Sequence, residues 1–404
     1  MKKETLPVVV AGAGPAGLTS ALCLADKGVP VIVCEMEPGL TEDLRAGSYH
    51  PPTLEMLAPY GVTDEMHETG IVVPRWQIRD RTEGLLIEFD LSLLKDDTPY
   101  PYRLHLEQHK LTPILLAAAS RYPDFSIRFA TRVTAVQPFG PRVLVDVETV
   151  DGDKDRIEAS YVVGAEGVRS VVREAMGVSF EGFTWPETFL IVSTTYDFEP
   201  HGFTYATYIA DPVEWVMLFK VPGFNPPPLW RMALPSDPMR PRDEIMDPEV
   251  IQRRMQAFLP RPGGYDLVHR NTYRVHQRVA GAFNKGRLLI AGDAAHVNNP
   301  LGAMGLNGSV HDAVNLADKL APVWHGHAEP DTLDRYTRQR LPAQLDYVQQ
   351  ITIRNKRLVE EKDPAVKKQR QDELRRLATD RAAHYRYVLD SSMISSVRKA
   401  ASIA

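Results

Sequence analysis

A glycine-rich turn near the start of the chain constrains the fold more than any other feature. The sequence GAGPAG follows the apolar run Pro7 to Ala11 and precedes an apolar helical stretch from Leu18 to Ala25. A second apolar run, Val29 to Cys34, comes next. This order predicts a strand, a tight turn, a helix and a second strand, which is the unit from which open α/β sheets are built.

The spacing of the glycines gives this turn its chemical meaning. Gly12 permits the tight turn, Gly14 lets the backbone approach a pyrophosphate, and Gly17 lets helix and strand pack closely. Ala16 lies in the same turn, at the helix N-terminus whose amides and dipole attract phosphate. Glu35 ends the second strand, where a carboxylate accepts hydrogen bonds from an adenosine ribose. We predict a dinucleotide site; the alternative is a structural glycine turn beside a surface glutamate.

Later segments predict a second sheet and a return to the first one. Residues Phe125 to Val150 alternate apolar and polar side chains as an antiparallel meander does. Proline-broken, aromatic-rich strands between Phe180 and Arg278 suit a sheet that covers a ligand. After Ala282, the sequence RLLIAGDAAH reads as a buried strand, a loop and then a helix from about Gly308 to Leu320.

The predicted fold class is therefore α/β. A Rossmann-like nucleotide-binding domain is interleaved with a mixed-sheet substrate domain and followed by C-terminal helices. The expected boundaries are 1–75, 101–180 and 275–330 for the nucleotide domain, 76–100 and 181–274 for the substrate sheet, and 331–404 for the helical segment.

Composition argues against several classes of protein. A formal net charge of −5 gives no general attraction to nucleic acid. No run of about 18 apolar residues predicts membrane insertion. Cys23 and Cys34 lack the spacing of a metal site, so we expect two buried thiols and no bound metal. The N-terminal apolar run meets the glycine turn too early for a signal peptide, which favours a cytoplasmic protein.

Two further segments give the chain a resemblance to a known family. These are GAEGVRS, Gly164 to Ser170, and GRLLIAGDAAHVNNPLGAMGLN, Gly286 to Asn307. Together with the first turn they are similar, in order and spacing, to the three fingerprints of the FAD-dependent aromatic hydroxylases, the single-component class A monooxygenases typified by para-hydroxybenzoate hydroxylase. The resemblance covers nucleotide-domain segments from about Val8 to Lys319.

The resemblance implies a tightly bound FAD, with NADH or NADPH as a transient reductant and O2 as co-substrate. The implied reaction is hydroxylation of a small aromatic or N-heteroaromatic ring by a C4a-hydroperoxide of the flavin. In such a reaction the protein positions the reactants, excludes water and stabilises charge, because the redox chemistry belongs to the cofactor. Family habit also favours a homodimer.

The third segment supplies most of the expected flavin contacts. Asp293, at the end of a buried strand, is placed to bind the ribityl chain or waters on the pyrophosphate, and it is also a good helix N-cap. Gly302 and Gly305 allow backbone to lie against a flat ring. By resemblance, Pro300 lies beside the isoalloxazine, and Leu306 and Asn307 contact its pyrimidine side. Asn299 replaces the first of the family's usual paired prolines.

Other cofactor contacts are implied by the resemblance. Arg45 matches an arginine on the FAD side of the active site, and Gln108 matches a residue that touches the ribityl chain. Glu166 stands where the family normally has aspartate. Arg169 and Arg173 follow it at helical spacing, either as phosphate ligands or as helix-surface arginines.

Candidate substrate contacts are weaker. His50, in a turn near the expected flavin, is a candidate to bind or deprotonate a substrate hydroxyl, although a turn histidine without a catalytic role is more frequent. Tyr205 and Arg231 are candidates on the second sheet, since aromatic residues and an arginine suit a flat, anionic ring. The same sheet offers Tyr208, Trp215 and Phe219.

Three alternatives stay open at this point. One is an FAD-dependent reductase or epoxidase of a lipid or polyketide-like substrate, which as a reductase would oxidise NAD(P)H without consuming O2. Another is a non-catalytic FAD-fold binding protein, which would show no substrate-stimulated NAD(P)H oxidation. The third is a plain NAD-dependent dehydrogenase, which would purify colourless.

Overall fold

The first sheet of the protein is a parallel, nucleotide-binding type of sheet. The computed structural model describes residues 6–42 and 47–404. Its six-stranded sheet has the order β18-β19-β12-β1-β2-β8, and all neighbours are parallel except β18 and β19. The strands are β1 (Val8–Ala11), β2 (Val31–Cys34), β8 (Phe125–Arg128), β12 (Tyr161–Gly164), β18 (Asn284–Lys285) and β19 (Leu288–Ile290). Continuous apolar runs form β1 and β12 because parallel strands are buried on both faces.

The second sheet is mixed and has eight strands in the order β20-β17-β13-β16-β15-β14-β5-β6. The strands are β5 (Arg75–Asp80), β6 (Gly84–Asp90), β13 (Phe180–Thr194), β14 (Ala206–Ala210), β15 (Val216–Val221), β16 (Leu229–Ser236), β17 (His269–Ala280) and β20 (His296–Val297). Neighbouring strands are antiparallel except β5 and β14. The long pair β13 and β17 runs from Phe180 opposite Ala280 to Ser193 opposite His269.

Each face of the second sheet packs into a different core. Side chains alternate between the faces along a strand. On β16, Ala233 packs into the core shared with the C-terminal helices, whereas Trp230 and Met232 pack into the core under two short helices. These helices are α6 (Arg242–Ile245) and α7 (Pro248–Phe258). We call the first face the inner face and the second the outer face.

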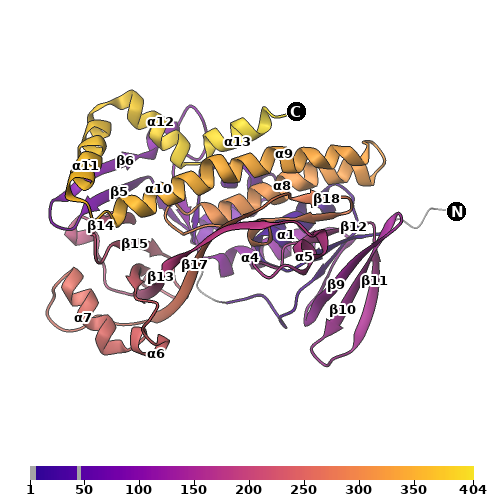
Figure 1. Cartoon of the computed structure of the whole chain (residues 1–404), viewed down its shortest axis with the longest axis horizontal. Coiled ribbons are helices and arrows are strands. Elements are labelled where there is room, and N and C mark those ends of the chain that lie inside the picture. The colour runs from indigo at the N-terminus through magenta and orange to yellow at the C-terminus, as the bar shows by residue number, and fades with distance from the viewer. Residues whose placement is uncertain (1–5, 43–46) are drawn as a thin grey trace.

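Helices and two small sheets complete the fold (Figure 1). The helices are α1 (Pro15–Asp26), α2 (Pro51–Leu57), α3 (Val62–Thr69), α4 (Gln108–Ala119), α5 (Val171–Met176), α8 (Met304–Trp324), α9 (Asp334–Pro342), α10 (Gln350–Val359), α11 (Pro364–Thr379), α12 (Arg381–Ser391) and α13 (Ile394–Ala401). One small sheet joins β3 (Ser48–Tyr49), β7 (Arg103–His105) and β4 (Ile71–Val73). The other is the meander β9 (Thr131–Phe139), β10 (Arg142–Thr149) and β11 (Lys154–Ala159), which projects at one end of the molecule.

The predicted fold class is confirmed, and the differences concern boundaries. The predicted meander begins with β8, which instead joins the first sheet as its edge strand. The helix expected from about Gly308 begins at Met304, because Ala303 in the left-handed region ends the preceding loop. Cys23 and Cys34 are buried free thiols, as expected. Within the described ranges, none of the helices combines the length and apolarity needed to cross a membrane.

Candidate active site

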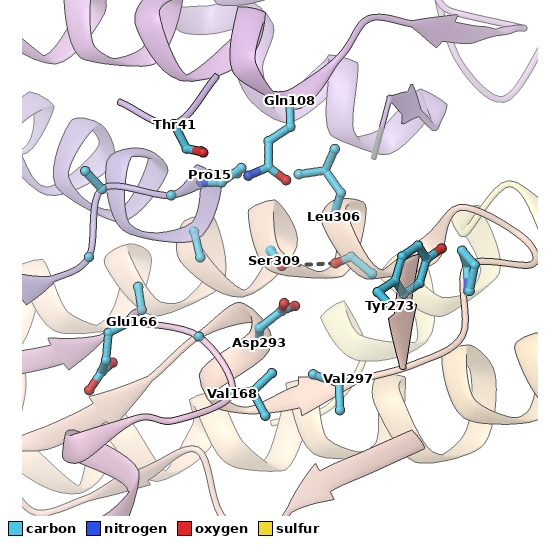
Figure 2. Close-up of a pocket in the computed structure, with 18 of the residues that line it drawn as sticks. Pro15, Thr41, Gln108, Glu166, Val168, Tyr273, Asp293, Val297, Leu306 and Ser309 are labelled. Carbon is cyan, nitrogen blue, oxygen red and sulfur yellow. Dashed lines mark hydrogen bonds between the residues drawn. The ribbon is translucent and has the colours of Figure 1, made fainter. Parts of the chain in front are cut away.

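The ends of four parallel strands converge on one cavity. In the first sheet Ala11 lies opposite both Cys34 and Gly164, and Gly164 lies opposite Ile290. Because parallel strands end at the same edge, the segments that follow these residues meet there. They line a cavity of about 1560 Å³ whose other wall is the inner face of the second sheet. Figure 2 shows side chains from these segments facing one another.

The glycine turn packs backbone against backbone at distances that exclude side chains. Gly12 has a φ of +97°, and a Cβ there would lie 2.6 Å from the Ala165 carbonyl oxygen. A Cβ on Gly17 would lie 1.9 Å from the Gly12 carbonyl oxygen, so the helix can pack here only without a side chain. Gly14 lines the cavity, and its Cβ would meet no atom within 4 Å. Gly14, Ala16 and the first turn of α1 thus leave room for a pyrophosphate at a helix N-terminus.

Glu35 lies beside this turn, as the sequence predicts. Its carboxylate accepts hydrogen bonds from the backbone amides of Ala13, at 2.6 Å, and Glu37, at 3.0 Å. The residue lines the cavity directly after β2. These two bonds fix the carboxylate beside the glycine turn, at the wall of the cavity.

Glu166 stands at the cavity, but its carboxyl group serves the protein itself. Its Oε1 accepts a hydrogen bond from the Val172 amide at 2.9 Å, in the first turn of α5. Burial raises the pKa of this carboxyl group. In Figure 2 the side chain turns away from Asp293 and Gln108. The longer glutamate side chain therefore caps a helix, while the backbone of residues 165–168 lines the cavity.

The two arginines after Glu166 have different positions. Arg173 is buried and donates hydrogen bonds to the carbonyl oxygens of Ala294, at 2.9 Å, and Val168, at 2.6 Å. It therefore ties the middle motif to the third one. Arg169 is exposed and lines the cavity.

Asp293 and Gln108 point into the same open space (Figure 2). Asp293 lies in a short 3-10 turn at Gly292–Ala294, and the long helix begins only at Met304, so Asp293 does not cap that helix. Gln108 is the first residue of α4. Arg45 lies outside the described residues.

A buried ionic cluster that the sequence analysis missed supports the turn at Asp293. Asp312, on α8, accepts hydrogen bonds from the Gly292 amide at 3.1 Å, His296 Nε2 at 2.6 Å and Arg340 Nε at 2.7 Å. Burial opposes ionisation, but His296 and Arg340 hold the pKa of Asp312 below its ordinary value. The signal available in the sequence was an aspartate among apolar residues on the helix after the third motif, since a buried charge needs a partner.

The loop before α8 separates residues that line the cavity from residues that support it. Pro300, Gly305 and Leu306 line the cavity. Asn307 is fully buried behind them; it accepts from the His50 amide at 2.8 Å and donates to the Ser48 carbonyl at 2.9 Å. Its side chain therefore joins α8 to the turn before α2.

Gly302 and His50 lie on the supporting side of this loop. His50 is fully buried, and its Nε2 lies 2.8 Å from the Gly302 carbonyl oxygen. Because a carbonyl only accepts, Nε2 carries the proton. Burial holds the pKa of His50 well below its ordinary value. Neither residue is among those that line the cavity, so the structure places His50 behind the wall that was expected to present it.

The inner face of the second sheet forms the opposite wall. Register places Phe219 opposite Arg231, and Met217 opposite Ala233, with Ile191 next to Ala233 on β13. All five line the cavity. Ile191, Met217, Phe219 and Ala233 form an apolar strip, and the guanidinium group of Arg231 lies beside Phe219.

Two tyrosines, Tyr205 just before β14 and Tyr208 within it, show how side-chain alternation decides which residues face the cavity. Tyr205 does not line the cavity; its hydroxyl donates to the Glu199 carboxylate at 3.1 Å, on the outer face. Tyr208, three residues on, faces inward but is buried behind the loop at Gly302. Trp215 is likewise buried and does not line the cavity.

Tyr273 is a cavity residue that the sequence analysis missed. It lies on β17 and lines the cavity together with Asn271. Burial raises its pKa to about 12, so its phenol stays protonated and can donate a hydrogen bond. In Figure 2 its ring stands on the same side of the cavity as Leu306 and Val297.

The cavity thus joins a glycine turn at a helix N-terminus, a carboxylate directly after β2 and an apolar sheet face, an arrangement typical of proteins that bind a dinucleotide. Comparisons with known proteins agree with this. Residues 5–351 match the family described as "FAD binding domain". The chain is 34% identical to para-nitrophenol 4-monooxygenase of a Pseudomonas species, over 98% of both chains. It is also 34% identical to 6-hydroxy-3-succinoylpyridine 3-monooxygenase of Pseudomonas putida, over 82% of this chain and 84% of that one.

Solved structures give the same result. A crystal structure of p-nitrophenol 4-monooxygenase from Pseudomonas putida superposes with a TM-score of 0.91 at 31% identity, covering 98% of both chains. The chain therefore belongs to the FAD-binding family of single-component aromatic hydroxylases. Its cofactor is FAD, its activity is that of an aromatic monooxygenase, and the alternatives left open by the sequence are not supported.

Proposed function

We propose that this monooxygenase hydroxylates a single phenol or hydroxypyridine ring that carries an anionic or strongly electron-withdrawing group. Its relatives are named for nitrophenol and hydroxypyridine substrates. The observation that carries the proposal is the strip of Phe219, Met217, Ala233 and Ile191, with Arg231 beside Phe219. A flat ring fits the apolar part, and a guanidinium group binds an oxyanion through charge-assisted hydrogen bonds.

The residues around the glycine turn fit FAD, and we propose roles for them. Gly12, Gly14, Ala16 and Gly17 would form the pyrophosphate turn, and Glu35 would bind the adenosine ribose. Asp293 and Gln108 would contact the ribityl chain, because both side chains point into the cavity between the turn and the second sheet. When bound, FAD supplies reduction by NAD(P)H and activation of O2.

The flavin-facing wall would be formed by Pro300, Gly305 and Leu306, with Gly302 and Asn307 as its supports. The first amides of α8 would stabilise negative charge on the bound ring system, since a helix N-terminus favours anions. Tyr273 would donate a hydrogen bond to the substrate or to its hydroxylated product. The buried apolar strip excludes water, which strengthens each of these interactions.

A substrate panel with an Arg231 variant tests this proposal. The panel contains para-nitrophenol, para-hydroxybenzoate, a hydroxypyridine carboxylate and unsubstituted phenol, with NAD(P)H oxidation, O2 uptake and product mass measured. We expect hydroxylated product from an anionic or nitro-bearing ring. Arg231→Met should raise KM for that ring by about tenfold or more, since a hydrogen bond to a charged group contributes about 1.5–3 kcal/mol.

The matched control is Arg240→Met, because Arg240 is an exposed arginine whose partner is Glu244, one turn along the chain. It should leave KM unchanged. Hydroxylation of phenol alone, or an equal KM change for charged and neutral rings in Arg231→Met, would contradict the assignment of Arg231.

We also propose that the enzyme works in the cytoplasm, where its nicotinamide reductant is found, and as a homodimer. Size-exclusion chromatography with light scattering tests the second point, and a monomer at micromolar concentration would refute it.

A further inference from the structure

Two neighbouring residues with positive φ angles stand in the loop before α8. Gly302 has a φ of +122° and Ala303 a φ of +57°. A residue with a Cβ is strained in this left-handed region by about 1–3 kcal/mol, and such a conformation persists only where its surroundings determine it. Ala303 lines the cavity, so the strained conformation shapes the flavin-facing wall itself.

Both backbone polar groups of Gly302 are held by buried side chains. Its amide donates to the Tyr208 hydroxyl at 3.1 Å, and its carbonyl accepts from His50 Nε2 at 2.8 Å. Tyr208 comes from β14 of the second sheet, and His50 from the turn before α2. Two distant parts of the fold therefore fix one glycine on opposite sides.

A buried cation lies behind Tyr208. Arg103 is 1% exposed, lies over the Trp76 ring at 4.9 Å, and interacts with the Tyr208 hydroxyl. Within the part of the chain that the structure describes, its Nε and Nη1 atoms have no hydrogen-bond partner and no carboxylate pairs with it. A guanidinium group only donates, so it keeps the Tyr208 oxygen in the role of acceptor for Gly302.

We propose that Tyr208, His50 and Arg103 are positioning residues that clamp Gly302, so that Pro300 and Ala303 hold the cofactor ring in register with the substrate strip. The proposal rests on the hydroxylase function proposed above. The clamp determines how much of the NAD(P)H that is oxidised yields hydroxylated product. Without this positioning, NAD(P)H, a proton and O2 would give NAD(P)+ and hydrogen peroxide, and no oxygen would be transferred to the substrate.

The decisive variant is Tyr208→Phe, which removes the hydroxyl and keeps the ring. We expect normal FAD content and an unchanged unfolding temperature within a few degrees. Product formed per NAD(P)H should fall, with peroxide making up the difference, and kcat/KM for hydroxylation should fall about tenfold or more, because small displacements near the reacting atoms have effects up to about 10²-fold. The absorbance spectrum of the bound flavin should also shift.

Tyr205→Phe is the matched control. It removes the same hydroxyl three residues earlier on the same chain segment, where the group faces Glu199 on the outer face. Its product ratio, flavin spectrum and KM should equal those of the parent enzyme.

His50 and Arg103 supply independent tests. His50→Leu removes the donor to Gly302, whereas His50→Gln can place an amide N–H at the Nε2 position. His50→Leu should lower the amount of product formed per NAD(P)H, as Tyr208→Phe does. His50→Gln should restore most of that amount. Arg103→Met should give the same defect, with Arg103→Lys between it and the parent.

Two results together would overturn the proposed clamp. If Tyr208→Phe and a folded His50→Leu both keep the parental amount of product per NAD(P)H and the parental flavin spectrum, the proposal is wrong. If instead the parent enzyme makes no hydroxylated product from any ring while its FAD spectrum responds to these substitutions, the function proposed above fails and the clamp stands.

Discussion

The two walls of the cavity are built in different ways. The cofactor wall is mostly backbone, since the turn at Gly12 and the segment after Gly164 approach each other at distances that exclude side chains. The substrate wall is made of alternate side chains on neighbouring strands, such as Met217, Ala233 and Ile191. The comparison shows that one wall is specified by where side chains are missing and the other by which side chains face inward.

The largest expected effect tests what holds the cofactor wall in place. Asp312→Ala leaves Arg340 buried without its carboxylate partner, which typically costs about 3–5 kcal/mol. We expect a loss of that size in the free energy of urea unfolding, together with loss of bound FAD. Asp318→Ala, which removes a half-exposed ion pair with Lys27, should cost less than about 1 kcal/mol. Equal losses in the two variants would show that the buried cluster has no special role.

A pair of glycine variants separates folding from cofactor binding on the same wall. Gly17→Ala places a Cβ 1.9 Å from the Gly12 carbonyl oxygen, and this overpacking should destabilise the protein by about 3 kcal/mol. Gly14→Ala meets no atom within 4 Å and should leave the unfolding of the apoprotein unchanged. Its methyl group enters the cavity, so it should weaken FAD binding, measured by fluorescence titration. Unweakened FAD binding in Gly14→Ala would disprove the pyrophosphate site.

Ala233 tests the substrate wall alone. Ala233→Val adds bulk to the middle of the apolar strip, and one methylene group in such a pocket changes discrimination by about 1–3 kcal/mol. We expect KM to rise most for the bulkiest ring of the panel, with FAD affinity unchanged. Ala135→Val, on an exposed position of β9, is the control. A change in FAD affinity in Ala233→Val would mean that the two walls are not independent.

The smallest expected effect is a change in the pH dependence of stability caused by two buried histidines, His105 and His311. Burial lowers the pKa of His105 to about 4 and that of His311 to about 3, below the ordinary value of 6.5. Below pH 6.5 these histidines bind protons in the unfolded chain but not in the folded protein, so their contribution lowers stability as pH falls from 6.5 towards 4 and does not change above about 6.5. Each histidine should contribute about 1.4 kcal/mol per pH unit.

Urea unfolding from pH 8 to pH 5 measures this slope. His105→Asn keeps a donor for the Lys220 carbonyl and removes one titrating group, so it should flatten the slope by one histidine's share. His325→Asn, at an exposed histidine that bonds the Lys27 carbonyl, should leave the slope unchanged. If His105→Asn keeps the parental slope of unfolding free energy against pH, the pKa of His105 is not lowered in the folded protein.

The glycine turn could be found in the sequence because phosphate binding at a strand end demands glycine at fixed spacings. Gly12, Gly14 and Glu35 all line the cavity, and their contacts with FAD stay a prediction. The substrate wall depends on register and parity, which are set by pairing between distant strands. Tyr205 was therefore named although it faces outward, and Tyr273 was missed although it faces the cavity.

Supporting residues are hard to predict for a related reason. Asp312 and His50 act through partners far along the chain, and nothing in the local sequence names those partners. Glu166 illustrates the opposite case. Its motif was recognised, yet its carboxyl group accepts a hydrogen bond from the Val172 amide in the first turn of α5.

The ribbon formed by β13 and β17 joins two halves of the cavity, the half with the cofactor wall and the half with the substrate wall. At one end β17 pairs with β20, which carries Val297 of the cofactor wall; at the other end it carries Asn271 of the substrate wall. Any rotation of one half against the other must therefore twist this pair of strands, whose register shifts between Thr184 and Thr188. Resistance of the ribbon to that twist would keep ring and substrate aligned through many turnovers.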